Sequence, residues 1–162
     1  MLETRVKLFK KFIVNIKRKS LPTRDNLQNM ALMVLKIKDS TIVASSAGMP
    51  PIYICRGLTG NVEEHIIKGM PLGAVNYYPY DIVNLDLMPH DTVLLLSDGF
   101  QELLNENKET LDYSKVKSIL KSVCHKSPQE IIEHLHSVSH QWKGNSIQND
   151  DMTFIVFKIK ST

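Results

Sequence analysis

Short apolar runs, each about the length of a β-strand, recur along the chain and are separated by turn-forming residues. Several alternate between apolar and polar positions, as in "YDIVNLDL" at residues 80–87, and this period of two is typical of a half-buried strand. The runs follow one another closely, which favours antiparallel hairpins. Helical patterns stand before and after this series, so the chain is predicted to be α+β, with antiparallel sheet covered by helices.

The predicted strands form two hairpins and three further strands. They lie at residues 30–37, 41–45, 50–57, 61–67, 80–87, 92–96 and 152–159. The first two are predicted to pair over residues 30–46, with a turn at Asp39 and Ser40. The runs 80–87 and 92–96, joined by the turn "MPHD", are predicted to form the second hairpin.

Helical periodicity predicts a leading amphipathic helix over residues 1–20 and later helices at 100–105 and 112–123. The last helix carries clear end signals. Ser127 caps it, Pro128 takes the first helical position, and Glu130 reaches back to complete a capping box. Gly144 is predicted to end this helix.

The composition excludes several classes of function. The net charge of +3 is too small to indicate a nucleic-acid partner, and no apolar run is long enough to insert into a membrane. Lysines interrupt the apolar residues at the N-terminus, so no signal peptide is predicted and a cytoplasmic protein is expected. Residues 1–24 hold eight Lys or Arg against one Glu; a solvated helix face is favoured over a patch for an acidic partner.

The chain has two cysteines, Cys55 and Cys124. They lie far apart in the sequence and match no metal-binding spacing. We therefore expect two free thiols in a reducing compartment.

Acidic residues stand at two predicted strand ends. Asp98 follows the apolar run of "LLLSDGFQE", at residues 94–102, and Asp150 and Asp151 precede the last strand. If those two strands are antiparallel neighbours, the carboxylates come to one edge of the sheet, where they suit Mg²⁺ or Mn²⁺. Gly99 would let backbone and water approach closely. The spacing alone leaves an ordinary turn at Asp98 as the alternative.

Four motifs follow one another in a characteristic order. They are "ASSAGMPPIYI", "GMPLGA", "DTVLLLSDGFQE" and "NDDMTFIVFKI". This succession resembles the SpoIIE-like branch of the metal-dependent protein phosphatases, the PPM or type 2C family, over residues 29–159. The resemblance implies an αββα sandwich of two antiparallel sheets flanked by helices. It also implies hydrolysis of phosphoserine or phosphothreonine on a protein.

The resemblance assigns roles to the acidic residues. It implies that Asp98 and Asp150 are metal ligands and that the backbone of Gly99 adjoins the metal. Asp151 is implied to orient these ligands from the next layer of residues around the metal. The family uses two Mg²⁺ or Mn²⁺ ions and forms no covalent enzyme intermediate, so no catalytic nucleophile is assigned. The implied partner is a phosphorylated protein, with a STAS-type anti-sigma-factor antagonist as the candidate.

The sequence departs from the family at two places. The motif Asp-x-x-Gly-His-Gly, which supplies a carboxylate bridging the two metals, is not present, and Met49 stands where the family commonly has histidine. We therefore expect residues 1–162 to form a single, N-terminally truncated phosphatase domain that holds one weakly bound ion or none. A missing N-terminal segment, a sensor domain or a second copy would then cover the shortened sheets. A catalytically inactive module that binds proteins in a partner-switching pathway is the alternative.

Two weaker patterns are interpreted as structural. His136 and His140 have a spacing that can chelate zinc, but without a third ligand nearby they are expected to lie on a polar helix face. Gly69–Gly73 is interpreted as a tight turn, because no helix start follows to hold a phosphate.

Overall fold

The computed structural model describes residues 29–38, 40–148 and 150–161. These divide into two compact units, one formed by described residues up to 49 together with 67–86, the other by 50–66 and 87–161. The leading helix predicted for residues 1–20, the turn residue Asp39 and Asn149 lie outside the described ranges. Within those ranges, no helix has the length and apolar content that crossing a membrane requires.

The first unit contains a three-stranded antiparallel sheet in the order β1-β2-β5. Its strands are β1 (Leu32–Lys38), β2 (Thr41–Ala47) and β5 (Val83–Asp86). β1 and β2 pair along their full length, from Leu32 opposite Ala47 to Lys38 opposite Thr41. The hairpin predicted for residues 30–46 is therefore confirmed.

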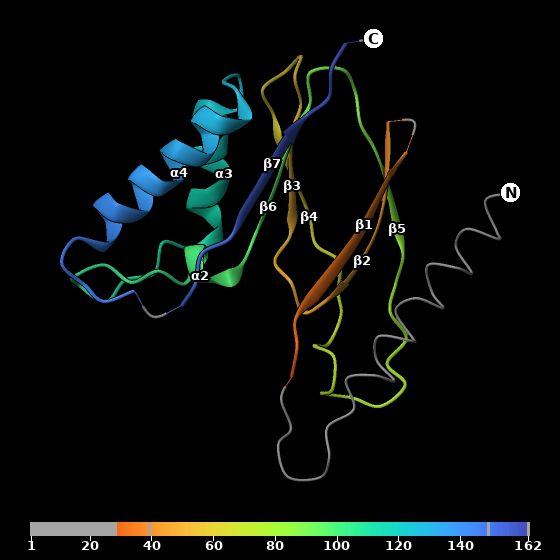
Figure 1. Ribbon diagram of the computed structural model, residues 1–162, viewed down its shortest axis with the longest axis horizontal. Coiled ribbons are helices and arrows are strands. Elements are labelled where there is room, and N and C mark those ends of the chain that lie inside the picture. The colour runs from red at the N-terminus through yellow and green to blue at the C-terminus, as the bar shows by residue number, and fades with distance from the viewer. Residues whose placement is uncertain (1–28, 39, 149, 162) are drawn as a thin grey trace, which may run out of the picture. The chain divides into compact units, whose positions relative to one another are not determined.

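The second unit contains a four-stranded antiparallel sheet in the order β4-β3-β6-β7 (Figure 1). Its strands are β3 (Ile52–Cys55), β4 (Val62–His65), β6 (Thr92–Leu96) and β7 (Phe154–Lys158). All five residues of β6 are buried or half-buried, as expected of a strand with a neighbour on each edge.

The second predicted hairpin is wrong, because β5 and β6 belong to different sheets. β5 pairs with β2, whereas β6 pairs with β3 and β7. The turn between them is bound to the end of β3: Asp91 accepts hydrogen bonds from the Arg56 side chain at 2.7 Å and the Gly57 backbone at 2.9 Å. A short turn between two strands therefore does not make them partners when burial favours other neighbours.

Among the described residues, the second unit contains three helices: α2 (Asp98–Gln101), α3 (Tyr113–Val123) and α4 (Pro128–Lys143). The capping box of α4 forms as predicted, with Gly144 at its C-cap. The helix predicted for residues 100–105 is wrong in its bounds. It begins at Asp98 and ends at Gln101, because Leu104 forms a β-bridge with Thr110 instead of extending the helix.

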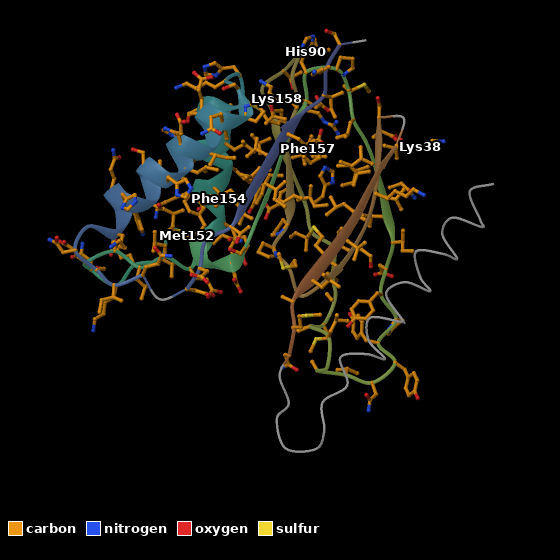
Figure 2. The ribbon with its side chains drawn as sticks, in the orientation of Figure 1. Lys38, His90, Met152, Phe154, Phe157 and Lys158 are labelled. Atoms are coloured by element: carbon orange, nitrogen blue, oxygen red, sulfur yellow. A yellow bond between two sulfur atoms is a disulfide. The ribbon has the colours of Figure 1, made fainter. Side chains whose placement is uncertain are left out.

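Helices α3 and α4 lie along the sheet of the second unit (Figure 1). A buried apolar cluster fills the space between the sheet and these helices. Met152 and Phe154 extend toward the helices from the start of β7 (Figure 2) and pack against this cluster. The cluster consists of Tyr53, Cys55, Val62, Leu94, Leu96, Phe100, Leu111, Val116, Leu120, Val123, Ile131 and Leu135. This core fixes β6 and β7 as rigid neighbours.

The expectation of two free thiols is wrong. The structure joins Cys55, the last residue of β3, to Cys124, the C-cap residue of α3, in a disulfide with Cα atoms 6.3 Å apart. Sequence spacing gave no sign of this pair, because the contact depends on how α3 packs against the sheet.

Candidate functional site

The carboxylates singled out in the sequence come to one edge of the second sheet. β6 and β7 are antiparallel neighbours, with Leu96 opposite Phe154. Asp98 follows the end of β6, and Asp150 and Asp151 precede the start of β7. The register therefore brings these three exposed residues to the same edge, as the geometric argument required.

Ser97 fixes the two segments against each other. Its backbone N–H donates to the Thr153 carbonyl at 3.1 Å, and its Oγ accepts from the Thr153 N–H at 2.9 Å. The same hydroxyl donates to the Asp151 carbonyl at 3.0 Å. Sequence reasoning missed this residue, although its place between the apolar run and Asp98 was visible.

Gly99 permits the close approach of these segments. A Cβ at this position would lie 2.5 Å from the Asp151 carbonyl oxygen and 3.4 Å from the Asp150 carbonyl carbon. No side chain fits there without displacement of backbone. The sequence-based expectation of a close backbone approach at Gly99 agrees with this contact.

Gly99→Ala is expected to push the Asp150–Asp151 segment away from β6. We expect it to lower the free energy of unfolding by about 1–3 kcal/mol, as overpacking does, and to weaken Mn²⁺ binding at this edge. Chemical denaturation and calorimetry measure the two effects. Gly60→Ala is the matched control: its Cβ meets no atom within 4 Å, so only the backbone cost of its φ of +65° applies. Unchanged stability and ion binding in Gly99→Ala would contradict the prediction.

A cavity of about 380 Å³ opens beside this edge. Its lining consists of Gly99, Glu102, Leu103, Leu104, Thr110 and Asp150. Glu102 was not singled out in the sequence, although it stands only four residues after Asp98 in "SDGFQE". Both carboxylates of the lining, on Glu102 and Asp150, belong to exposed residues.

The electrostatic potential at this edge is negative, because acidic side chains gather there. The pKa of the Tyr113 hydroxyl is raised above its ordinary value, first by burial and then by the charges of Glu102 and Asp98. A phosphate group approaching the same edge meets the same negative charges, so it needs a cation to bind there.

The donor set fits a hard divalent cation, but with few ligands. Carboxylate oxygens are the ligands that Mg²⁺ and Mn²⁺ take in proteins, together with several waters. In the part of the chain that the structure describes, no group of three or more His, Cys, Asp or Glu side chains is placed to hold a metal. The role of Asp98 and Asp150 as ligands of one weakly bound ion therefore stays a prediction.

Outside this edge, the "ASSAG" part of the first motif and the "GMPLGA" motif lie in the first unit, and the histidine pair lies on α4. A Cβ on Gly69 would contact the Ser46 carbonyl, and a Cβ on Gly48 would lie 2.7 Å from Pro71, so the "ASSAG" and "GMPLGA" motifs pack together. The Met49 N–H donates to Ser46 Oγ at 3.2 Å.

On α4 the His136 ring packs edge-on against Phe154, a contact that belongs to packing and not to zinc binding.

Comparison with known proteins gives one family. The model described as Stage II sporulation protein E (SpoIIE) matches residues 13–160. Stage II sporulation protein E of Bacillus subtilis (strain 168) is 27% identical over 143 residues, and that of Priestia megaterium is 26% identical over 144 residues. These alignments cover 86% and 87% of the chain but 16% and 23% of the relatives.

The comparison with solved structures agrees with the family match. The structure of the phosphatase domain of the cell fate determinant SpoIIE from Bacillus subtilis (Mn presoaked) has a TM-score of 0.66 at 25% identity. That match covers 96% of this chain and 67% of the other. The SiaA-PP2C domain of Pseudomonas aeruginosa has a TM-score of 0.67 at 20% identity and shares the fold. It is matched over 80% of this chain and 51% of its own.

Proposed function

Because the chain belongs to the SpoIIE family, whose model matches residues 13–160, we propose that it hydrolyses phosphoserine or phosphothreonine on a protein substrate with the help of a divalent metal ion. Its family and its α+β fold are those of the PP2C-type protein phosphatases. It would do so as the C-terminal part of a SpoIIE-like phosphatase domain.

The observation that carries this proposal is that Asp98, Asp150 and Asp151 lie at the same edge, where β6 ends and β7 begins. Ser97 and Gly99 hold the two segments in contact there. Carboxylates held on rigid strand ends are a suitable arrangement for a hard metal ion, because their positions need little reordering on binding.

We assign Asp98 and Asp150 the role of holding Mg²⁺ or Mn²⁺, and Asp151 the role of supporting Asp150. The Asp150 Oδ1 atom accepts a hydrogen bond from the Asp151 N–H at 2.7 Å, which orients the Asp150 carboxylate. When bound, the metal supplies a water activated for attack and positive charge for the phosphate.

A second function is favoured by a specific observation. Among the described residues, no group of three or more His, Cys, Asp or Glu side chains is placed so that it could hold a metal ion. A chain with so few ligands would act instead as a module that binds proteins in a partner-switching pathway. The two candidates differ in whether a divalent ion binds at all.

Mn²⁺ binding measured by calorimetry tests the proposal. We expect a dissociation constant tighter than about 1 mM, near 4 kcal/mol of binding free energy, and loss of that binding in Asp98→Asn. Turnover of p-nitrophenyl phosphate with Mn²⁺ then tests hydrolysis, and Asp98→Asn is expected to abolish it.

The matched control is Glu133→Gln, which removes one exposed carboxylate charge on α4, where Glu133 accepts a hydrogen bond from Gln129. It is expected to bind Mn²⁺ as the unchanged chain does. If neither the unchanged chain nor Asp98→Asn gives binding heat, the metal-dependent activity is ruled out for this chain and the binding module takes its place.

The substrate we propose is a phosphorylated protein of the STAS type, because the chain resembles the phosphatases of partner-switching pathways. A cytoplasmic location is part of the same proposal. The family's two-metal chemistry would need a bridging carboxylate from outside the described residues, so one ion is proposed for this chain by itself.

A further inference from the structure

The cavity beside Asp98 is lined by both apolar and acidic side chains. Leu103 is 3% exposed and Leu104 is half-buried, and both line the cavity together with Glu102 and Asp150. Its volume of about 380 Å³ is enough for one long side chain. The leucines offer no metal ligand, so the walls suit an amphipathic group better than a bare ion.

The loop that forms one wall is held by its own hydrogen bonds. The Asn105 side-chain oxygen accepts from the N–H groups of Asn107 and Glu109, both at 2.9 Å. The Leu103 carbonyl accepts from the Trp142 indole at 3.0 Å and from the Leu111 N–H at 3.0 Å. The cavity is therefore formed before any ligand binds, and little ordering entropy is lost when one enters.

The charge around the cavity is acidic. Between residues 97 and 112 the chain holds five acidic side chains and one basic one. These are Asp98, Glu102, Glu106, Glu109 and Asp112, against Lys108. Glu106 accepts from the Asn145 N–H and Glu109 accepts from the Asn105 side chain, whereas Glu102 makes no ion pair or side-chain hydrogen bond among the described residues. The carboxylate of Glu102 is thus available to a ligand.

We propose that this cavity binds a lysine or arginine side chain that flanks the phosphorylated residue of the substrate, with Glu102 as the residue that selects it. The proposal rests on the phosphatase function proposed above. A basic side chain has an apolar stem that suits Leu103 and Leu104 and a charged head that suits Glu102. An acidic residue at the same place would face like charges and be rejected.

The test uses phosphoserine pentapeptides that carry lysine, norleucine or glutamate at one flanking position, scanned over the two positions on each side. Binding to the whole chain is measured by fluorescence anisotropy in 1 mM MnCl₂, with a non-hydrolysable phosphonate in place of each phosphoserine, so the readout does not depend on turnover. At one position we expect the lysine peptide to bind about tenfold more tightly than the glutamate peptide, with norleucine between them. Glu102→Gln is expected to remove this preference, and Glu102→Lys to reverse it.

Glu109→Gln is the matched control, because it lies on the same loop but does not line the cavity. It is expected to keep the preference for lysine. Equal binding of the three peptides at every position, or a preference that survives in Glu102→Gln, overturns the proposal. If the lysine preference depends on Glu102 while p-nitrophenyl phosphate is not hydrolysed, the cavity assignment stands and the phosphatase function fails.

Discussion

Asp91→Ala lowers the free energy of unfolding by about 2–4 kcal/mol, because it removes a buried carboxylate that accepts hydrogen bonds from a charged group and from the backbone. The Asp91 side chain is 1% exposed, and it accepts three hydrogen bonds. These come from the Arg56 guanidinium and from the backbone N–H groups of Gly57 and Met88. Its loss leaves the two backbone donors without their acceptor and the Arg56 charge with one partner fewer.

Another partner of Arg56 among the described residues is Glu63, which binds the guanidinium through both oxygens, at 2.7 and 2.6 Å. The pKa of Glu63 is lowered, first by these hydrogen bonds from Arg56. This pair alone cannot hold the turn before β6, because its atoms lie on β4 and at the end of β3. Asp91 is therefore the side chain that fixes the entry of the chain into the second sheet.

Denaturation by urea measures this prediction, with Glu133→Ala as the control. Glu133 is exposed and its one hydrogen bond is to Gln129, so its loss is expected to change stability by no more than about 0.5 kcal/mol. A loss of stability of similar size in the two variants would show that Asp91 does not hold the turn.

Cys124→Ser lowers the free energy of unfolding by about 2–4 kcal/mol in the absence of reductant, since the disulfide no longer restricts the unfolded chain. The two cysteines are 69 residues apart in sequence, so the bond closes a long loop. It also ties the C-terminal end of α3 to β3 at the edge of the buried core.

Thermal unfolding of the unchanged chain and of Cys124→Ser, each with and without excess reductant, measures the effect. Reductant is expected to lower the melting temperature of the unchanged chain to that of the variant and to leave the variant unaltered. Titration of two free thiols in the unchanged chain purified without reductant, with equal melting temperatures, would refute the prediction.

The sequence was sufficient for features that depend on neighbouring residues. The capping box of Ser127 and Glu130, the bounds of α3 and the hairpin over residues 30–46 all follow from local periodicity and turn chemistry. Local signals succeed here because the groups that satisfy one another are a few residues apart. The order of the four motifs also indicated the family before any contact was known.

The candidate site was predicted in part. Asp98, Asp150 and Asp151 were chosen from their strand-end positions, and the structure brings them to one edge; their role as metal ligands remains a prediction. Ser97 and Glu102 were missed. Their importance comes from segments some 50 residues away or from a cavity, and neither is visible in a linear pattern.

The sequence by itself determined the α+β class, most of the element positions and the three acidic residues that come to the sheet edge. The tertiary structure decided the partner of each strand, the joining of Cys55 to Cys124 and the walls of the cavity beside Glu102. The second predicted hairpin failed for the same reason. Strand pairing is chosen by which neighbours bury a strand and satisfy its polar groups, and β6 meets that condition only between β3 and β7.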